Sequence, residues 1–237
     1  MEFNIFFEKI KEKLNKINIE IEEKEAKKFY KYMDLLLEWN EKINLTAITE
    51  PEDIILKHFV DSLTIKEHIE ENSKVIDVGT GAGFPGIPLN IVTNCNIILL
   101  DSLNKRVNFL NEVINNLELK NIEAIHSRVE EFAKNKKYRE KYDVATSRAV
   151  ASLNVLAEYL LPLVKVNGIC VCMKGSNIEE IKDAENALKI LGGKIEKIEK
   201  IILPGTDIER NIIVIRKEKE TPSKYPRKAG TPSKEPL

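Results

Sequence analysis

The sequence predicts an α/β fold: a seven-stranded, mostly parallel sheet that ends in an antiparallel hairpin, preceded by a helical segment. From Lys74 onward, short apolar runs alternate with amphipathic segments, as in chains built from β-α-β units. The last two apolar runs have no helix between them, and apolar residues near the start of the chain recur at helical spacing. We therefore divide the chain into residues 1–70, 71–217 and 218–237.

The first segment is expected to form helices that pack on the sheet. Apolar side chains repeat at helical spacing over residues 3–14, and again over about 22–40. A third helix is predicted over roughly 52–65, with Thr49 as its cap and Pro51 in its first turn. The segment thus contributes three helices before the sheet begins.

The sheet is predicted from seven apolar runs. The first five are VIDV, IILLD, IEAIHS, YDVATS and ICVCMK. Helices are predicted between and after these runs, over 88–92, 105–117, 129–133, 153–164 and 178–191. The last two runs, KIEKIEKIILP and RNIIVIRKE, are joined by PGTDIE, which is too short for a parallel crossover. They are therefore expected to pair as an antiparallel hairpin.

Composition excludes several classes of protein. Lys and Arg (37) nearly cancel Asp and Glu (38), so any nucleic-acid surface must be local. Three cysteines are too few for a disulfide framework, and we expect Cys170 and Cys172 to be buried on one strand face. The N-terminus is not a signal peptide, and no apolar run is long enough to cross a membrane. We expect a cytoplasmic protein.

A glycine loop follows the first predicted strand, with Gly79, Gly81 and Gly83 at every second position. In open α/β sheets, ligands bind at the carboxyl ends of the strands. Asp77 ends the first strand and Asp101 ends the second, where a carboxylate can accept both hydroxyls of a ribose. This arrangement fits either a nicotinamide dinucleotide or S-adenosylmethionine.

Three details favour S-adenosylmethionine. Phe84 stands where the dinucleotide fingerprint requires glycine. Pro85 and Pro88 remove amide donors that a pyrophosphate needs, whereas a sulfonium cofactor carries no phosphate. Asp77 suits a cationic amino group, directly or through water, and would repel a pyrophosphate. The alternatives are a tight turn without a ligand and a nicotinamide-dependent oxidoreductase.

Ordered blocks from about Trp39 to the C-terminus resemble one family. They are WNEKINLT, HFVDS, IDVGTGAGFPGIPL, LLDSLNKRVNFL, SRVEEF, SRAVASL and YPRKAGTPSKEPL. Together they are similar to the bacterial 16S ribosomal RNA guanine-N7 methyltransferases, RsmG, also called glucose-inhibited division protein B. The resemblance implies a class I, Rossmann-like methyltransferase fold for residues 71–217. It also implies methyl transfer from S-adenosylmethionine to guanosine N7 in the 530 loop of 16S rRNA, at position 527 in the usual rRNA numbering.

The resemblance also implies contacts to the cofactor, which fall on Gly79, Phe84, Val129, Glu130 and Arg148. The residues themselves add three further candidates, which are Asp77, Gly81 and Asp101. We expect the partner to be 16S rRNA or the 30S subunit, and the protein to be a monomer. The alternative functions are a methyltransferase for another RNA, a protein or a small molecule, and a non-catalytic RNA-binding protein.

The chemistry predicts positioning rather than general-base catalysis. N7 of guanine carries a lone pair and no proton, so it can attack the methyl group directly. Candidates for positioning the base are Asn44, His58, Asp61, Ser62, Arg148 and Lys174. His58 and Asp61 are three residues apart and should share a helix face, although His58 could simply pack in the core. We expect no metal site, because His68 and His126 lie far in sequence from other ligands.

The tail, residues 218–237, holds four prolines and two copies of TPSK. We expect it to be extended and to bind RNA through Lys224, Arg227 and Lys228, with Tyr225 stacking on a base. The alternative is a disordered, solubilising end.

Overall fold

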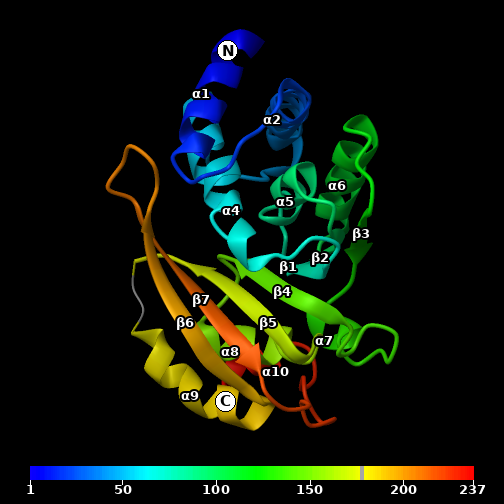
Figure 1. The fold of residues 1–237 in the computed structure, drawn as a ribbon. Helices are drawn as coiled ribbons and strands as arrows, with labels where there is room; N and C mark the ends of the chain where they lie inside the picture. The colour runs from blue at the N-terminus through cyan, green and yellow to red at the C-terminus, as the bar shows by residue number, and fades with distance from the viewer. Residues whose placement is uncertain (177–178) are drawn as a thin grey trace.

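The computed structural model describes residues 1–176 and 179–237. It contains a seven-stranded sheet with the strand order β3-β2-β1-β4-β5-β7-β6 (Figure 1). The strands are β1 (Lys74–Val78), β2 (Asn96–Asp101), β3 (Ile122–His126), β4 (Tyr142–Arg148), β5 (Val164–Lys174), β6 (Gly193–Ile202) and β7 (Glu209–Lys217). β1 to β5 pair in parallel, while β7 runs antiparallel to both β5 and β6. The predicted parallel sheet with a terminal hairpin is confirmed.

Helices cover both faces of this sheet. On one side lie α1 (Phe3–Asn15), α2 (Glu23–Ile43), α5 (Gly86–Val92) and α6 (Asn104–Asn116). On the other side lie α7 (Val129–Phe132), α8 (Leu153–Leu160), α9 (Glu180–Leu191) and α10 (Thr231–Lys234). Figure 1 shows the N-terminal helices, in blue and cyan, on the α5 side, and the C-terminus beside α8 and α9.

Strand side chains alternate between two hydrophobic cores. Val75 of β1 faces the core formed with the N-terminal helices, whereas Ile76 faces the core under α8 and α9. Cys170 and Cys172, two residues apart on β5, both lie in the second core as free thiols. Burial on both faces explains why the central strands are apolar almost throughout.

The predicted third helix is interrupted by a wider turn. The chain forms α3 (Pro51–Ile54), the π-helical segment η1 (Ile55–Val60) and α4 (Asp61–Leu63). Glu50, rather than the predicted Thr49, precedes the first helical residue. A π turn has no periodicity signal of its own in so short a segment, and such turns often occur at functional sites.

Two other boundaries differ from the predictions. The helix expected over 153–164 ends at Leu160, because β5 already begins at Val164. The apolar run there fits a helix and a strand equally well, so periodicity alone could not separate them. The start predicted for the next helix, Ile178, lies outside the described residues, and α9 begins at Glu180. No helix in the described ranges is long and apolar enough to cross a membrane.

Candidate active site

The glycine loop turns sharply between β1 and α5. Gly79 and Gly83 have φ values of +69° and +100°, a backbone region that L side chains rarely adopt. A Cβ at Gly79 would also lie 2.6 Å from Val150 Cγ2. The loop therefore requires glycine for conformation and for space.

Asp77 lies beneath this loop and is fully buried. Its Oδ2 accepts hydrogen bonds from Thr80 Oγ1 at 2.6 Å and from the Gly86 amide at 2.9 Å. Its Oδ1 is buried and has no hydrogen-bond partner within the described part of the chain. Burial raises the pKa of Asp77 to about 6, although the two hydrogen bonds oppose the shift. The buried Oδ1 therefore keeps its lone pairs unused by the described residues, although Asp77 does not itself line the cavity that Gly79 borders.

Asp101 connects the end of β2 to the glycine loop. Its Oδ2 accepts the Gly81 amide at 2.9 Å, and its Oδ1 accepts the Leu103 amide at 2.9 Å. Two residues predicted from separate motifs are thus in direct contact. Arg106 Nη1 also lies 3.4 Å from Oδ2, so Oδ1 is the oxygen that keeps a further lone pair for a ligand hydroxyl.

A cavity of about 250 Å³ opens at the carboxyl ends of β1 and β2, and we call it the cofactor cavity. Its lining includes Gly79, Val129 and Glu130, three of the predicted cofactor residues. Glu130 is buried, and its Oε1 accepts a hydrogen bond from the Gly230 amide at 2.8 Å. The tail therefore reaches this cavity, which the sequence did not predict.

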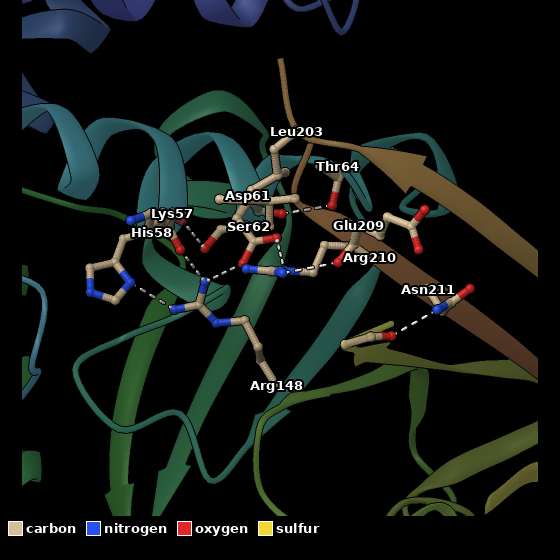
Figure 2. Close-up of polar contacts among 12 residues, drawn as sticks. Lys57, His58, Asp61, Ser62, Thr64, Arg148, Leu203, Glu209, Arg210 and Asn211 are labelled. Atoms are coloured by element: carbon tan, nitrogen blue, oxygen red, sulfur yellow. Dashed lines mark hydrogen bonds and ion pairs between the residues drawn. The ribbon is translucent and has the colours of Figure 1, made fainter. Parts of the chain in front are cut away.

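Arg148 lies at the end of β4 and binds two residues of the interrupted helix. Its Nη1 is 2.9 Å from Asp61 Oδ2, and its Nη2 is 3.2 Å from His58 Nδ1 (Figure 2). Asp61 is 3% exposed on its side chain, and its other oxygen accepts Arg210 Nε at 3.1 Å. One buried carboxylate thus joins two guanidinium groups. The predicted shared face of His58 and Asp61 is the face that meets Arg148.

His58 is held as a neutral imidazole. Its ring stacks on Phe84, with centroids 4.4 Å apart, and its Nε2 lies 2.8 Å from Thr46 Oγ1. Burial, followed by the charge of Arg148, lowers the pKa of His58 to about 3. Because Arg148 donates to Nδ1, the single proton belongs on Nε2. Phe84, predicted at the cofactor, lies on this side of the loop, with Arg148 Cζ 5.0 Å from its ring centroid.

A second cavity, of about 400 Å³, lies beside Arg148, and we call it the charged pocket. Four cationic side chains and one carboxylate line it: Lys57, Arg148, Lys174, Arg210 and Asp61. Lys174 is fixed there by Ala151 O at 2.7 Å and by Glu180 Oε1 at 2.9 Å. Lys57 is paired with Asp53 at 2.9 Å. Arg148 and Arg210 share Asp61, so the pocket keeps an excess of one positive charge. An excess of positive charge in a concave site attracts an anionic ligand.

The other two positioning candidates have local roles. Asn44 ends α2 with a left-handed backbone, and its amide donates to Asn40 O. Ser62 is buried, and its hydroxyl donates to His58 O. Neither residue lines the cofactor cavity or the charged pocket.

Sequence reasoning missed Lys57 and Arg210 as members of the charged pocket. Arg210 follows the hairpin turn directly, and β7 runs antiparallel, so the beginning of β7 lies where the parallel strands end. The position of Arg210 at the start of β7 could therefore have indicated from the sequence that it lies at the ligand-binding edge of the sheet. Its contact with Asp61, 149 residues away, could not have been predicted in this way.

The tail is folded against the domain. Lys224 and Lys228 are exposed, whereas the Arg227 guanidinium forms an ion pair with Glu158, with Nη2 2.7 Å from Oε2. Tyr225 is 6% exposed and packs in the core under α8. The prediction that Tyr225 stacks on a base is wrong for this conformation, because the ring is already buried.

His68 lies close to two carboxylates that could bind a metal ion with it, one of which is distant in the sequence. Its Nε2 is 2.8 Å from Glu199 Oε2, and Glu67 completes a possible metal-binding group. The Lys197 ammonium also contacts Glu199 and disfavours a cation there. The absence of a functional metal stays a prediction.

Comparison with known proteins assigns the family. The family model described as rRNA small subunit methyltransferase G, GidB, matches residues 25–213. The chain belongs to this family. A ribosomal RNA small subunit methyltransferase G from Acetivibrio thermocellus is 55% identical over 221 residues, covering 92% of this chain and 91% of the relative. One from Clostridium perfringens is 50% identical over 236 residues, covering 98% of this chain and 99% of the relative.

Solved structures agree on the fold. A SAM-dependent methyltransferase from Aquifex aeolicus has a TM-score of 0.52 at 19% identity, covering 70% of this chain and 93% of that chain. Precorrin-6y C5,15-methyltransferase from Geobacter metallireducens has a TM-score of 0.51 at 14% identity, covering 67% and 88%. The predicted class I methyltransferase fold is confirmed. As a member of the methyltransferase G family, the chain uses S-adenosylmethionine, and the strained glycine loop and the unpartnered Asp77 oxygen fit that cofactor.

Proposed function

We propose that this protein transfers a methyl group from S-adenosylmethionine to N7 of a guanosine in the 530 loop of 16S rRNA. We further propose that it acts in the cytoplasm as a monomer, without a metal ion. Membership of the family supports the class of reaction, and the arrangement of the two cavities supports the role that we propose for each residue.

The cofactor is proposed to occupy the cofactor cavity and the adjoining glycine loop. When bound, it supplies a methyl group made electrophilic by the sulfonium sulfur. Asp101 would accept hydrogen bonds from the ribose hydroxyls, and Asp77 Oδ1 would face the amino group, directly or through water. Gly79 and Gly81 allow the backbone to pass close to the ligand.

The guanosine is proposed to enter the charged pocket. Lys57 and Arg210 at its rim would bind phosphate, and phosphate contacts orient an RNA without reading its sequence. Arg148 faces the same pocket while it is held by Asp61. This arrangement places the base by charge and shape and needs no group to remove a proton.

The observation that carries this proposal is that one short segment borders both cavities. Arg148 and Ala149 line the charged pocket, while Val150 lines the cofactor cavity. Guanosine N7 in the charged pocket and the methyl group of the cofactor in the cofactor cavity would therefore approach each other beside residues 148–150. Holding the two reactants in line is the main contribution an enzyme can make to a direct methyl transfer.

His58 and Asp61 are proposed as positioning residues rather than as proton acceptors. The His58 proton is on Nε2, and its Nδ1 is occupied by Arg148. The two oxygens of Asp61 are each engaged by an arginine. Their common effect is to fix the guanidinium of Arg148 at the end of β4.

The decisive test is methyl transfer from labelled S-adenosylmethionine to 30S subunits from a strain that lacks this modification, with mapping at nucleotide resolution. We expect label at one guanosine N7 in the 530 loop. Parallel reactions with naked 16S rRNA identify which form is the substrate. Cofactor binding without label on either RNA would contradict the proposed substrate and leave the methyltransferase assignment in place.

A further inference from the structure

The two TPSK copies in the tail have different structural roles. The first copy, Thr221–Lys224, anchors the tail: the Thr221 hydroxyl donates to Leu191 O at 2.8 Å, and its amide donates to Glu140 Oε1 at 2.9 Å. The Arg139 guanidinium donates hydrogen bonds to the backbone carbonyls of Thr221 and Tyr225, each at 2.7 Å. This copy lies away from the cofactor cavity.

The second copy, Thr231–Lys234, forms α10 and borders the cofactor cavity. Its Ser233 hydroxyl lies 2.9 Å from the hydroxyl of Tyr159, which also lines the cavity. Just before this copy, the Gly230 amide donates to Glu130. Ser233 and Gly230 thus both line the cavity.

A buried ion pair holds the tail in this position. Glu158 is 1% exposed, and it accepts hydrogen bonds from both the backbone amide and the guanidinium of Arg227, at 2.7 Å each. The same guanidinium donates to Glu235 O at 2.8 Å, beyond the second TPSK copy. Breaking such a pair leaves an uncompensated buried charge, so the tail is fixed rather than loosely attached.

We propose that the tail is the outer wall of the cofactor's nucleoside subsite, and that Ser233 and Gly230 border the bound nucleoside. The inference rests on the proposed placement of the cofactor. The cavity suits an uncharged nucleoside, because Arg128 and Glu130 balance each other and Ser102 and Ser127 offer hydroxyls. The tail therefore contributes to cofactor affinity as well as offering exposed lysines to RNA.

The test is calorimetric binding of S-adenosylhomocysteine and of 5′-methylthioadenosine, which share the adenosine group. Three proteins are compared with the full chain: a truncation that ends at Ala229, Ser233→Tyr, and Ser223→Tyr. The last change is a matched control, because Ser223 is the equivalent of Ser233 in the first TPSK copy and is likewise exposed, but does not line the cavity. We expect the truncation and Ser233→Tyr to weaken both ligands by about tenfold, and Ser223→Tyr to leave both unchanged.

The outcomes separate this inference from the proposed function. A full chain that binds both ligands, with a truncation and a Ser233→Tyr variant that bind equally well, overturns the tail's role alone. Weakening of S-adenosylhomocysteine without weakening of 5′-methylthioadenosine overturns the nucleoside assignment. A full chain that binds neither ligand overturns the proposed function and this inference together. If thermal unfolding finds the truncation unfolded, the exposed Ser233 substitution decides the result.

Discussion

The cofactor cavity and the charged pocket lie at the same edge of the sheet but differ in charge. In the cofactor cavity, one arginine and one carboxylate cancel, and the remaining lining is apolar, hydroxyl or backbone. In the charged pocket, four cationic side chains surround Asp61, and after the pairing of Lys57 with Asp53 and of Lys174 with Glu180 an excess of one positive charge remains. A small cofactor is bound by shape and by hydrogen bonds, whereas a polyanion is bound by net charge.

The two cavities also use different parts of the chain. The cofactor cavity is built from the ends of β1 and β2, the start of α7, and the tail. The charged pocket is built from η1, the ends of β4 and β5, and the start of β7. Among the residues that the structure describes, the segment 148–150 borders both cavities, with Arg148 and Ala149 in the charged pocket and Val150 in the cofactor cavity. Changes in this segment should therefore affect both ligands.

The largest effect is expected for Arg148→Met. The change removes the guanidinium that links Asp61 to His58 and leaves Asp61 buried with Arg210 alone. We expect single-turnover methyl transfer to 30S subunits to fall by about 100-fold or more, since the guanidinium that lines the charged pocket is lost from the segment that borders both cavities. The control is Arg216→Met, which breaks an exposed ion pair with Glu196 on the hairpin. Equal rates for the two variants would contradict the central role of Arg148.

Gly79→Ala should affect the cofactor side most strongly, because Gly79 lines the cofactor cavity. The new methyl group would clash with Val150, and the backbone would be strained at φ +69°. We expect cofactor affinity to fall about tenfold, and the free energy of unfolding to fall by about 1–3 kcal/mol. Calorimetry and urea unfolding measure the two effects.

Gly205→Ala provides the matched control. Gly205 also has a positive φ, +76°, but a Cβ there would meet nothing within 4 Å. Only the conformational cost of about 1 kcal/mol is expected, with cofactor affinity unchanged. A loss of affinity in this variant would mean that general destabilisation, and not a local change at the glycine loop, explains the Gly79 result.

Two buried titratable groups, one beside each cavity, should give opposite pH dependences. The pKa of Asp77 rises from 3.8 to about 6 on folding, so this group lowers stability as the pH rises from about 4 to 6. The pKa of His58 falls from 6.5 to about 3, so this group raises stability as the pH rises from about 3 to 6.5.

Asp77→Asn should therefore make the free energy of unfolding rise more steeply between pH 4 and 6, and His58→Gln should flatten the rise. Each change is at most about 1.4 kcal/mol per pH unit, measured by urea unfolding. If the free energy of unfolding changed with pH in the same way for the unaltered protein and for both variants, the shifted pKa values of Asp77 and His58 would be refuted.

The smallest effect is expected for the double change Lys224→Gln and Lys228→Gln. Both lysines are exposed on the tail, and each phosphate contact adds about 0.7–0.9 to the salt dependence of RNA binding. The slope of log affinity against log salt should fall by about 1.4–1.8, with cofactor binding unchanged. Lys13→Gln in α1 with Lys16→Gln just after it controls for net charge. The same loss of slope in both double variants would show that the tail is not a local RNA contact.

Much of the fold could be predicted because its signals are local. The sheet strands, the hairpin and the glycine loop each follow from periodicity or turn chemistry within about ten residues. The shared face of His58 and Asp61 follows from helical spacing in the same way. The π turn and the end of α8 could not be predicted, because the local sequence fits more than one backbone conformation.

The sequence alone determined the fold class, the family and the cofactor, because these depend on ordered motifs and on patterns that each segment carries by itself. Tertiary structure alone decided that Asp61 joins Arg148 to Arg210, and that Glu130 meets Gly230 in the tail. These contacts span up to 149 residues and depend on strand order and register. The physical reason is that an ion pair requires two side chains to converge in space, and no local pattern records where a distant segment will lie.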